Sequence, residues 1–311
     1  MSYDLENINF RTVADPKGFV EESDAKYQAK LEKAAELIIE NHTKSPIVLL
    51  SGPSGSGKTT TAMKIAEVLN KRGIGTHYVS MDNYYKTLDS KDVPHTPDGE
   101  VDLESPYCID MDLLNQHFDK LAEGERIYVP KYEFARRIRS MDPSASIKLG
   151  KDEVVIFEGL HALNDMITDK HPDAFKLYIS ASSDVEFNGK VVFKRIWFRL
   201  VRRTVRDYLF RSSDPANTMA MWANVRRGEK LYISPFRAKA DFHFDTSMPY
   251  EPALFNETAT KLFSNVPEGI ERFEELRQVL PAIQLFGHID QSLVAPDGLL
   301  REFIGGGIYE Y

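Results

Sequence analysis

The sequence predicts an α/β protein with a doubly wound, mostly parallel sheet and helices on both faces. Residues 46–51 form a short continuous apolar run, which is typical of a buried parallel strand. A glycine-rich turn follows, and then an amphipathic helix over residues 59–71, which ends before Gly73. A second strand is expected at residues 76–81, and it completes a strand–helix–strand unit of the kind that builds such a sheet.

The rest of the chain continues this alternation. Residues 24–42 carry apolar side chains at helical spacing, which predicts a helix. This helix could pack on the main domain, or it could be a solvated leader. We therefore expect an N-terminal helical extension over residues 1–45 and one domain over residues 46–311. Later strands are expected at residues 127–129, 154–157, 175–179 and 242–244. Helical patterns lie between several of these strands.

Composition narrows the class of protein. The chain has 311 residues, of which 42% are hydrophobic and 28% charged, so it can bury an ordinary core. A lone cysteine, Cys108, cannot form an internal disulfide, and the N-terminus lacks a secretory pattern, which together predict a cytoplasmic protein. No apolar run reaches the ~18–20 residues of a membrane span. The net charge of −8 argues against a nucleic-acid partner, so the expected partner is a small-molecule substrate.

The glycine-rich turn matches a phosphate-binding loop and predicts a P-loop NTPase. Residues 52–59 read G-P-S-G-S-G-K-T and fit G-x-x-x-x-G-K-[ST] completely. Glycines allow the backbone N–H groups to approach phosphate oxygens, and the following helix adds the positive end of its dipole. Lys58 would reach the β- and γ-phosphates of ATP, and Thr59 would bind Mg²⁺. The residues expected to bind this cofactor are Gly52, Ser54, Gly55, Ser56, Gly57, Lys58, Thr59 and Thr60.

Two carboxylates follow apolar strands. Asp82 comes after the strand at 76–81, and Glu158 comes after the strand at 154–157. Ligands bind at the carboxyl ends of the strands in an open parallel sheet, so both acids are expected beside the phosphate loop. Phosphoryl transfer needs acidic groups for the metal and for the attacking hydroxyl, although either acid alone could be an ordinary loop residue. The phosphate loop and the two acids together predict a kinase that uses ATP to phosphorylate a hydroxyl group of a small molecule.

The segments around these acids resemble the uridine kinase and phosphoribulokinase family. Residues 80–86, S-M-D-N-Y-Y-K, are similar to its S-x-D-x-F-Y-[KR], and residues 157–163, F-E-G-L-H-A-L, are similar to its V-E-G-I-x-A-L. The resemblance covers roughly residues 46–250. It implies that Asp82 is the catalytic base and also touches Mg²⁺, that Glu158 is a metal ligand, and, by analogy alone, that a homo-oligomer is plausible.

Two further patterns resemble one branch of this family. Residues 202–207, R-R-T-V-R-D, and residues 300–306, L-R-E-F-I-G-G, are similar to uridine kinase-like proteins of which some carry an N-terminal TGS domain. The 45 residues before the kinase region are too few for that extra domain, which is therefore expected to be absent here.

An arginine-rich helix is expected over residues 194–211. Four of its arginines recur every three or four residues and so share one helical face. They are Arg195, Arg199, Arg202 and Arg206. In the family this region, about residues 190–230, is a lid that neutralises phosphate charge. We therefore expect Arg202 and Arg206 to be catalytic and Arg203 to bind the nucleotide. A solvated basic face and a polyanion-binding helix are the alternatives.

The expected acceptor site departs from the family pattern. The family's ribose-binding F-D-H-P corresponds here to L-E-S-P at residues 103–106, where the Glu104 carboxylate could accept hydrogen bonds from two vicinal hydroxyls. Its P-x-Y-D-F-x-x-H corresponds to residues 130–137, which keep the tyrosine but replace the histidine by arginine, and Met221 stands where the family has a glutamine. The residues expected to bind the acceptor are Asp82, Tyr85, Glu104, Tyr132 and Arg137, of which Tyr132 and Arg137 could equally be structural.

Three functions are consistent with these patterns. The first is a uridine or cytidine kinase that makes a 5′-monophosphate. The second is the same chemistry on another sugar-like or anionic acceptor, which Leu103, Arg137 and Met221 favour because they alter the groups that would read a pyrimidine. The third is a regulatory protein that binds a nucleotide but turns over little, and the two carboxylates and the arginine-rich helix count against it.

Overall fold

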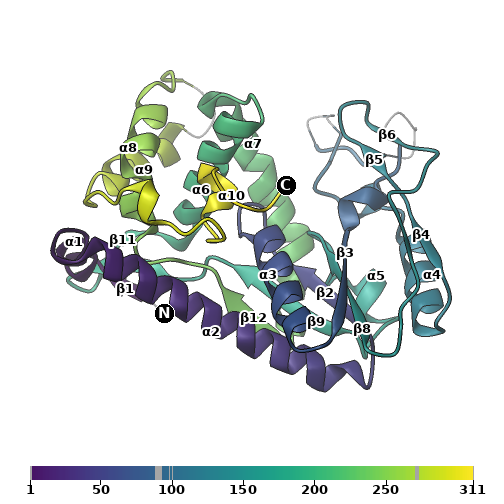
Figure 1. Ribbon diagram of the computed structural model, residues 1–311. Helices are drawn as coiled ribbons and strands as arrows, with labels where there is room; N and C mark the ends of the chain where they lie inside the picture. Colours follow the sequence, from purple (N-terminus) through teal and green to yellow (C-terminus); the bar gives the residue numbers. More distant parts are fainter. Residues whose placement is uncertain (1, 88–92, 98, 100, 270–272, 311) are drawn as a thin grey trace.

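A five-stranded parallel sheet lies at the centre of the computed structural model, which describes residues 2–87, 93–97, 99, 101–269 and 273–310 (Figure 1). The strand order is β12-β9-β2-β8-β3, and every neighbouring pair is parallel. Strand β2, the first strand of this sheet along the chain, is therefore its middle strand, and the loop after it leaves from the centre of the carboxyl edge. The strands are β2 (Ile47–Ser51), β3 (Gly75–Ser80), β8 (Glu153–Glu158), β9 (Phe175–Ser180) and β12 (Phe242–Asp245).

Helices cover both faces of this sheet, as the sequence predicts. Along β2, Val48 and Leu50 belong to one apolar core, and Ile47 and Leu49 belong to the other, because successive side chains of a strand point to opposite faces. The first core includes residues of α2 (Pro16–His42), α3 (Lys58–Lys71), α6 (Arg195–Phe210) and α8 (Glu251–Ser264). The second includes residues of α4 (Met111–Ala122) and α5 (Asp165–Thr168). The doubly wound α/β prediction is confirmed.

One expected strand does not join the central sheet. Ile127–Val129 is strand β4, but it pairs antiparallel with β7 (Ala145–Ile147), beside a second small pair of β5 (Tyr132–Glu133) and β6 (Ile138–Arg139). Its middle residue, Tyr128, is 62% exposed, whereas its two neighbours are buried. That alternation is typical of an antiparallel ribbon with one solvent-exposed face, whereas the central strands are apolar on both faces.

The N-terminal region is packed and not solvated. Helix α1 (Leu5–Ala14) leads into α2, whose start lies before the expected residue 24 because Pro16 occupies its first turn and the Asp15 carboxylate accepts a hydrogen bond from the Gly18 N–H. Tyr27 of α2 shares a 2.9 Å hydrogen bond with Thr61 of α3. The assignment of residues 1–45 as an extension of a separate kinase domain stays a prediction.

An unexpected small sheet precedes the lid and contains β1 (Ser2–Asp4), β10 (Asp184–Phe187) and β11 (Lys190–Phe193).

A helical layer lies above the carboxyl edge of the sheet (Figure 1). Helix α6 agrees closely with the expected arginine-rich helix, and it contacts α7, α8 and the short C-terminal α10. The remaining α-helices within the described residues are α7 (Pro215–Gly228), α9 (Phe273–Ile283) and α10 (Arg301–Ile304). Short turns complete the described elements: a π-helical turn η3 (Glu229–Ile233) and the 3₁₀ turns η1 (Met81–Tyr84), η2 (Pro106–Cys108), η4 (Ser234–Lys239) and η5 (Gln291–Leu293). Among the described residues, no helix is both long and apolar enough to cross a bilayer.

The packing of α2 predicts that it unfolds together with the sheet. Leu31 on α2 is fully buried in the first core, so Leu31→Ala should lower the free energy of unfolding by about 2–5 kcal/mol in urea titrations. The exposed Lys33 of the same helix provides a control, and Lys33→Ala should change that value by about 0.5 kcal/mol or less. An unchanged urea midpoint in Leu31→Ala would show that α2 is not part of the cooperative core.

Candidate active site

The phosphate loop connects β2 to α3 at the centre of the carboxyl edge. Its glycines occupy positions that other residues could not adopt easily. Gly55 and Gly57 have φ values of 74° and 79°, in the left-handed region. At Gly52, a Cβ atom would lie 2.0 Å from the carbonyl oxygen of Ile179 on β9, so only glycine allows this close approach. The sequence motif is thus matched by the backbone conformation that the motif requires.

The two predicted carboxylates lie beside this loop. Glu158 ends β8, the neighbour of β2, and its Oε1 is 3.7 Å from the Lys58 Nζ. Its Oε2 accepts hydrogen bonds from the Thr59 hydroxyl at 3.3 Å and from the Tyr78 hydroxyl at 2.9 Å. Asp82 follows β3 in η1 and lines the same cleft of about 170 Å³ with Lys58, Thr59 and Glu158. The structure therefore brings the loop and both acids together.

The electrostatics of the cleft suit a divalent cation. Burial and the neighbouring Glu158 charge together raise the pKa of Asp82 to about 6, while Lys58 and Arg211 oppose the rise. Two carboxylates close to one ammonium group leave excess negative charge, which a bound cation would relieve. Thr59, Asp82 and Glu158 supply the hydroxyl and carboxylate oxygens that Mg²⁺ prefers, so the residues present fit this metal.

Arg202, predicted to be catalytic, lies behind the phosphate loop and not in the cleft. Its side chain has no exposed surface, and its Nε and Nη2 donate to the two carboxylate oxygens of Glu251 on α8 at 2.6 and 2.7 Å. Nη2 also donates to the Thr246 carbonyl at 2.7 Å, and Nη1 donates to the Gly55 carbonyl at 3.4 Å. A guanidinium group held on all sides in this way cannot reach a phosphate in the cleft. Contrary to the expectation, the structure therefore does not place Arg202 in the cleft, and its hydrogen bonds support the loop from behind.

Neighbouring residues on α6 support the loop in a similar way. Arg199 donates through Nε to the Ser54 carbonyl at 2.9 Å, and Glu229 accepts hydrogen bonds from its two terminal nitrogens. Arg203, predicted to bind the nucleotide, donates through Nη1 to the Ser54 hydroxyl at 2.8 Å, so it contacts the loop itself. The arginines of α6 are thus divided between those that hold the loop and those that face the cleft.

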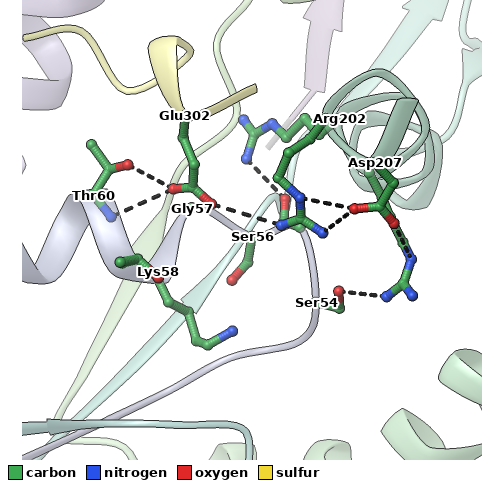
Figure 2. A network of polar contacts seen from close by, with 12 residues as sticks. Ser54, Ser56, Gly57, Lys58, Thr60, Arg202, Asp207 and Glu302 are labelled. Carbon is green, nitrogen blue, oxygen red and sulfur yellow. Dashed lines mark hydrogen bonds and ion pairs between the residues drawn. The ribbon is translucent and has the colours of Figure 1, made fainter. Parts of the chain in front are cut away.

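Arg206 and Arg211 face the cleft. Arg206 donates through Nη2 to Asp207 at 2.9 Å and lines the cavity with Asp82 and Glu158, as a charge-neutralising residue should. Arg211 lines the same cavity, with its Nη1 3.7 Å from Asp207. Sequence reasoning missed Arg211 as a site residue, although it ends the predicted arginine-rich stretch. In Figure 2, dashed lines join Asp207 to the arginine side chains drawn beside it.

The acceptor side of the cleft contains Glu104. This residue lines the cavity with Lys58 and Asp82, and burial raises its pKa to about 7, while Arg203 opposes the rise. Helix α7 packs directly on it, because a Cβ at Gly228 would lie 2.3 Å from the Glu104 Cβ. Glycine at position 228 therefore lets the lid region close onto the residue expected to hold the acceptor.

Aromatic residues form a wall next to Glu104. Tyr85 is buried, donates to the Leu103 carbonyl at 3.0 Å, and has its ring centroid 5.5 Å from that of Tyr132. The Tyr132 hydroxyl is buried and has no hydrogen-bond partner within the described part of the chain. Arg137 differs from the expectation, since it is exposed in the β5–β6 turn with a φ of 56° and, among the described residues, is not part of the cavity lining. Of the predicted acceptor residues, Asp82 and Glu104 line the cavity, whereas Arg137 lies outside it, close enough to Tyr132 to affect that residue electrostatically.

A second residue that sequence reasoning missed is Glu302. Its Oε2 accepts hydrogen bonds from the Thr60 hydroxyl at 2.6 Å and from the Thr60 N–H at 3.4 Å, although 242 positions separate the two residues. Glu302 lines the cleft and is only 8% exposed. The sole signal in the sequence is that residues 300–306 resemble a family branch, and a resemblance does not show which residue a side chain contacts.

Comparisons with known proteins find one matching family and several similar chains. A model of the Phosphoribulokinase / Uridine kinase family matches residues 47–250. A uridine kinase from Deinococcus deserti is 28% identical over 214 residues, which span 68% of this chain and 93% of that protein. A uridine kinase from Saccharomyces cerevisiae is 31% identical over 196 residues, 63% of this chain and 36% of the yeast protein. A solved structure from Silicibacter sp. TM1040, provisionally named a fructose transport system kinase, has 22% identity and a TM-score of 0.47 and covers 65% of this chain and 95% of its own.

The burial of Arg202 predicts a loss of stability upon its replacement. Arg202→Gln leaves the buried Glu251 carboxylate without its cation, which should cost about 3–5 kcal/mol in the free energy of unfolding measured by urea titration. Arg195→Gln is the matched control, because the Arg195 side chain is 58% exposed on the same helix, and its effect should be about 0.5 kcal/mol or less. A stable Arg202→Gln protein that has lost only turnover would contradict the supporting role.

The raised pKa of Asp82 predicts pH-dependent stabilisation by an uncharged replacement. The folded protein binds the Asp82 proton more tightly than the unfolded chain, so stability falls as pH rises from about 3.8 to about 6. Above that window, the folded protein carries a disfavoured buried charge. Asp82→Asn should therefore raise the thermal midpoint in Mg²⁺-free buffer, and raise it more at pH 8 than at pH 5. An equal shift at the two pH values would argue against this electrostatic explanation.

Proposed function

The chain belongs to the phosphoribulokinase/uridine kinase family, and from this premise we propose that it transfers the γ-phosphoryl group of ATP to a nucleoside, uridine or cytidine, to make the 5′-monophosphate. Membership makes it a P-loop kinase, and the identity of the acceptor is the proposed part. The observation that carries the proposal is the meeting of Lys58, Thr59, Asp82, Glu158 and Glu104 in one cleft at the carboxyl edge of the sheet.

Asp82 is proposed as the catalytic base. With a pKa of about 6, it is mostly ionised at neutral pH but is a stronger base than an ordinary aspartate, which favours proton removal from an acceptor hydroxyl. Bound Mg²⁺ would supply positive charge that neutralises the charge developing on the phosphate oxygens. Thr59 and Glu158 would hold that ion, and the Tyr78 hydroxyl fixes the orientation of the Glu158 carboxylate.

The cations of the site are proposed to act on the transferred group. Lys58 lies at the start of α3, where its ammonium group and the backbone N–H groups would contact the phosphate tail. Arg206 and Arg211 extend into the cleft from α6 and the residue after it, opposite Asp82. Such fixed positive charges stabilise the charge that spreads over the γ-phosphoryl oxygens in the transition state.

The acceptor side supports a neutral diol. The Glu104 carboxylate could accept hydrogen bonds from two neighbouring hydroxyls, as found in a ribose ring. The residue that favoured an anionic acceptor, Arg137, lies on the exposed β5–β6 turn. We therefore rank the nucleoside first and an uncharged sugar-like alcohol second, because Leu103 and Met221 still replace the groups with which the family pattern reads a pyrimidine.

A substrate panel tests this proposal. With ATP and Mg²⁺, purified protein should phosphorylate uridine or cytidine, and Asp82→Asn should lower kcat by at least ~10²-fold, the usual contribution of a catalytic base. Asp112→Asn, an exposed change of the same type on α4, should leave kcat unchanged. Turnover of sugars alone would favour the second acceptor class. ATP binding without turnover of any acceptor, or an Asp82→Asn enzyme with a normal rate, would refute the proposed reaction.

A further inference from the structure

The C-terminal segment 297–309, named here the C-terminal strap, runs along α3 and over the phosphate loop (Figure 1). It is attached at both ends. Near its start, the Asp297 carboxylate accepts a hydrogen bond from the Lys64 Nζ at 2.7 Å. At its far end, the Tyr309 hydroxyl donates to Glu67 at 2.7 Å. Both partners are on α3, so the strap is attached to that helix on either side of Glu302.

The middle of the strap covers the phosphate loop. A Cβ atom added to Gly57 would lie 2.7 Å from the Leu299 side chain, so the two are in direct contact. Leu299 and Phe303 are buried, and the Phe303 ring lies 5.2 Å from the Arg202 guanidinium carbon. These apolar contacts place Glu302, which lies between the two side chains in sequence, over the start of α3.

Glu302 occupies groups that a nucleotide would use. The first N–H groups of a helix have no partner within the helix, and in a phosphate loop they are donors to phosphate oxygens. Thr60 belongs to this first turn of α3, and its N–H and hydroxyl both donate to the Glu302 carboxylate. Figure 2 shows Glu302 facing Thr60 on one side and the arginine side chains of α6 on the other.

The second oxygen of Glu302 faces a cation of the lid. The Arg206 Nη1 is 4.0 Å from the Glu302 Oε1, and Arg206 is also one of the residues proposed to meet the γ-phosphoryl group. The Glu302 carboxylate therefore interacts both with Thr60 at the start of α3 and with Arg206, the arginine proposed to bind phosphate. A nearly buried carboxylate is stable only when it has such partners, and a phosphate group that claimed them would leave Glu302 close to a second anion.

We propose that Glu302 is an internal competitor of the nucleotide. Without nucleotide, the strap holds its carboxylate on Thr60 and near Arg206, and ATP can bind fully only when Glu302 leaves these groups. Its departure would also remove a competing carboxylate from beside Arg206, which Asp207 still holds in place, so nucleotide binding and the charge around this arginine are coupled. This inference rests on the proposed function in one respect, namely that the ligand of the loop is ATP.

The test is calorimetric titration of ATP, without acceptor, into wild-type protein and Glu302→Gln. The amide keeps the shape of the side chain but removes its charge, so the dissociation constant for ATP should fall about tenfold, the effect of losing one charge-assisted competitor. Asp290→Asn is the matched control, since Asp290 is exposed on η5 and caps only its own turn through the Ser292 N–H. That variant should bind ATP as the wild-type protein does.

A second variant covers the case in which Glu302→Gln fails to fold. Asp297→Asn removes an anchor of the strap without touching Thr60, and it should also tighten ATP binding, by a smaller factor. Equal dissociation constants in all variants would overturn the proposal. Weaker binding in Glu302→Gln would also overturn it, because Glu302 would then position Arg206 for the nucleotide. ATP binding that tightens as expected, but without phosphorylation of any acceptor, would refute the proposed reaction and leave the competitor in place.

Discussion

The structure depends on fixing the carbonyl groups of the phosphate loop. A peptide unit points its C=O and its N–H in opposite directions, so a loop whose carbonyls are held from behind presents its N–H groups to the cleft. Here Arg199 holds the Ser54 carbonyl, Arg202 holds the Gly55 carbonyl, and the Thr246 hydroxyl donates to the Ser56 carbonyl at 2.7 Å. The nest of donors that a phosphate tail needs is thus built before any ligand arrives.

Helix α6 therefore serves two purposes. Its inner face buries arginines as structural cations, each with an acidic partner from another helical element, Glu251 for Arg202 and Glu229 for Arg199. Burying such pairs has a large desolvation cost, and breaking one by removing a single partner is more costly still. Further along the same helix, Arg206 lines the cleft, and Arg211 lines it just after the helix ends. One rigid helix thereby links the conformation of the loop to the position of the cations above it.

The cleft itself is rich in carboxylates. Asp82, Glu158, Glu104 and Glu302 all line it, and Lys58 and two arginines are the cations that face them there within the described residues. Burial raises the pKa values of Asp82 and Glu104, so the charged form of each carboxyl group is disfavoured in the cleft. A metal ion and a nucleotide would change this balance, the ion by attracting the acids and the phosphates by competing with them for the same donors.

Local patterns in the sequence were sufficient to predict the loop, the two strand-end acids and the α/β class, because glycine spacing, strand ends and helix periodicity are properties of contiguous residues. Only the tertiary structure decided which arginines of α6 face the cleft, since periodicity places Arg202 and Arg206 on one face of a helix but does not say that Glu251 lies against the first. It also decided that Glu302 meets Thr60 and that Ile127–Val129 pairs outside the central sheet. Each of these contacts joins elements brought together by packing, and the free energy that selects them belongs to the assembled core and not to either segment alone.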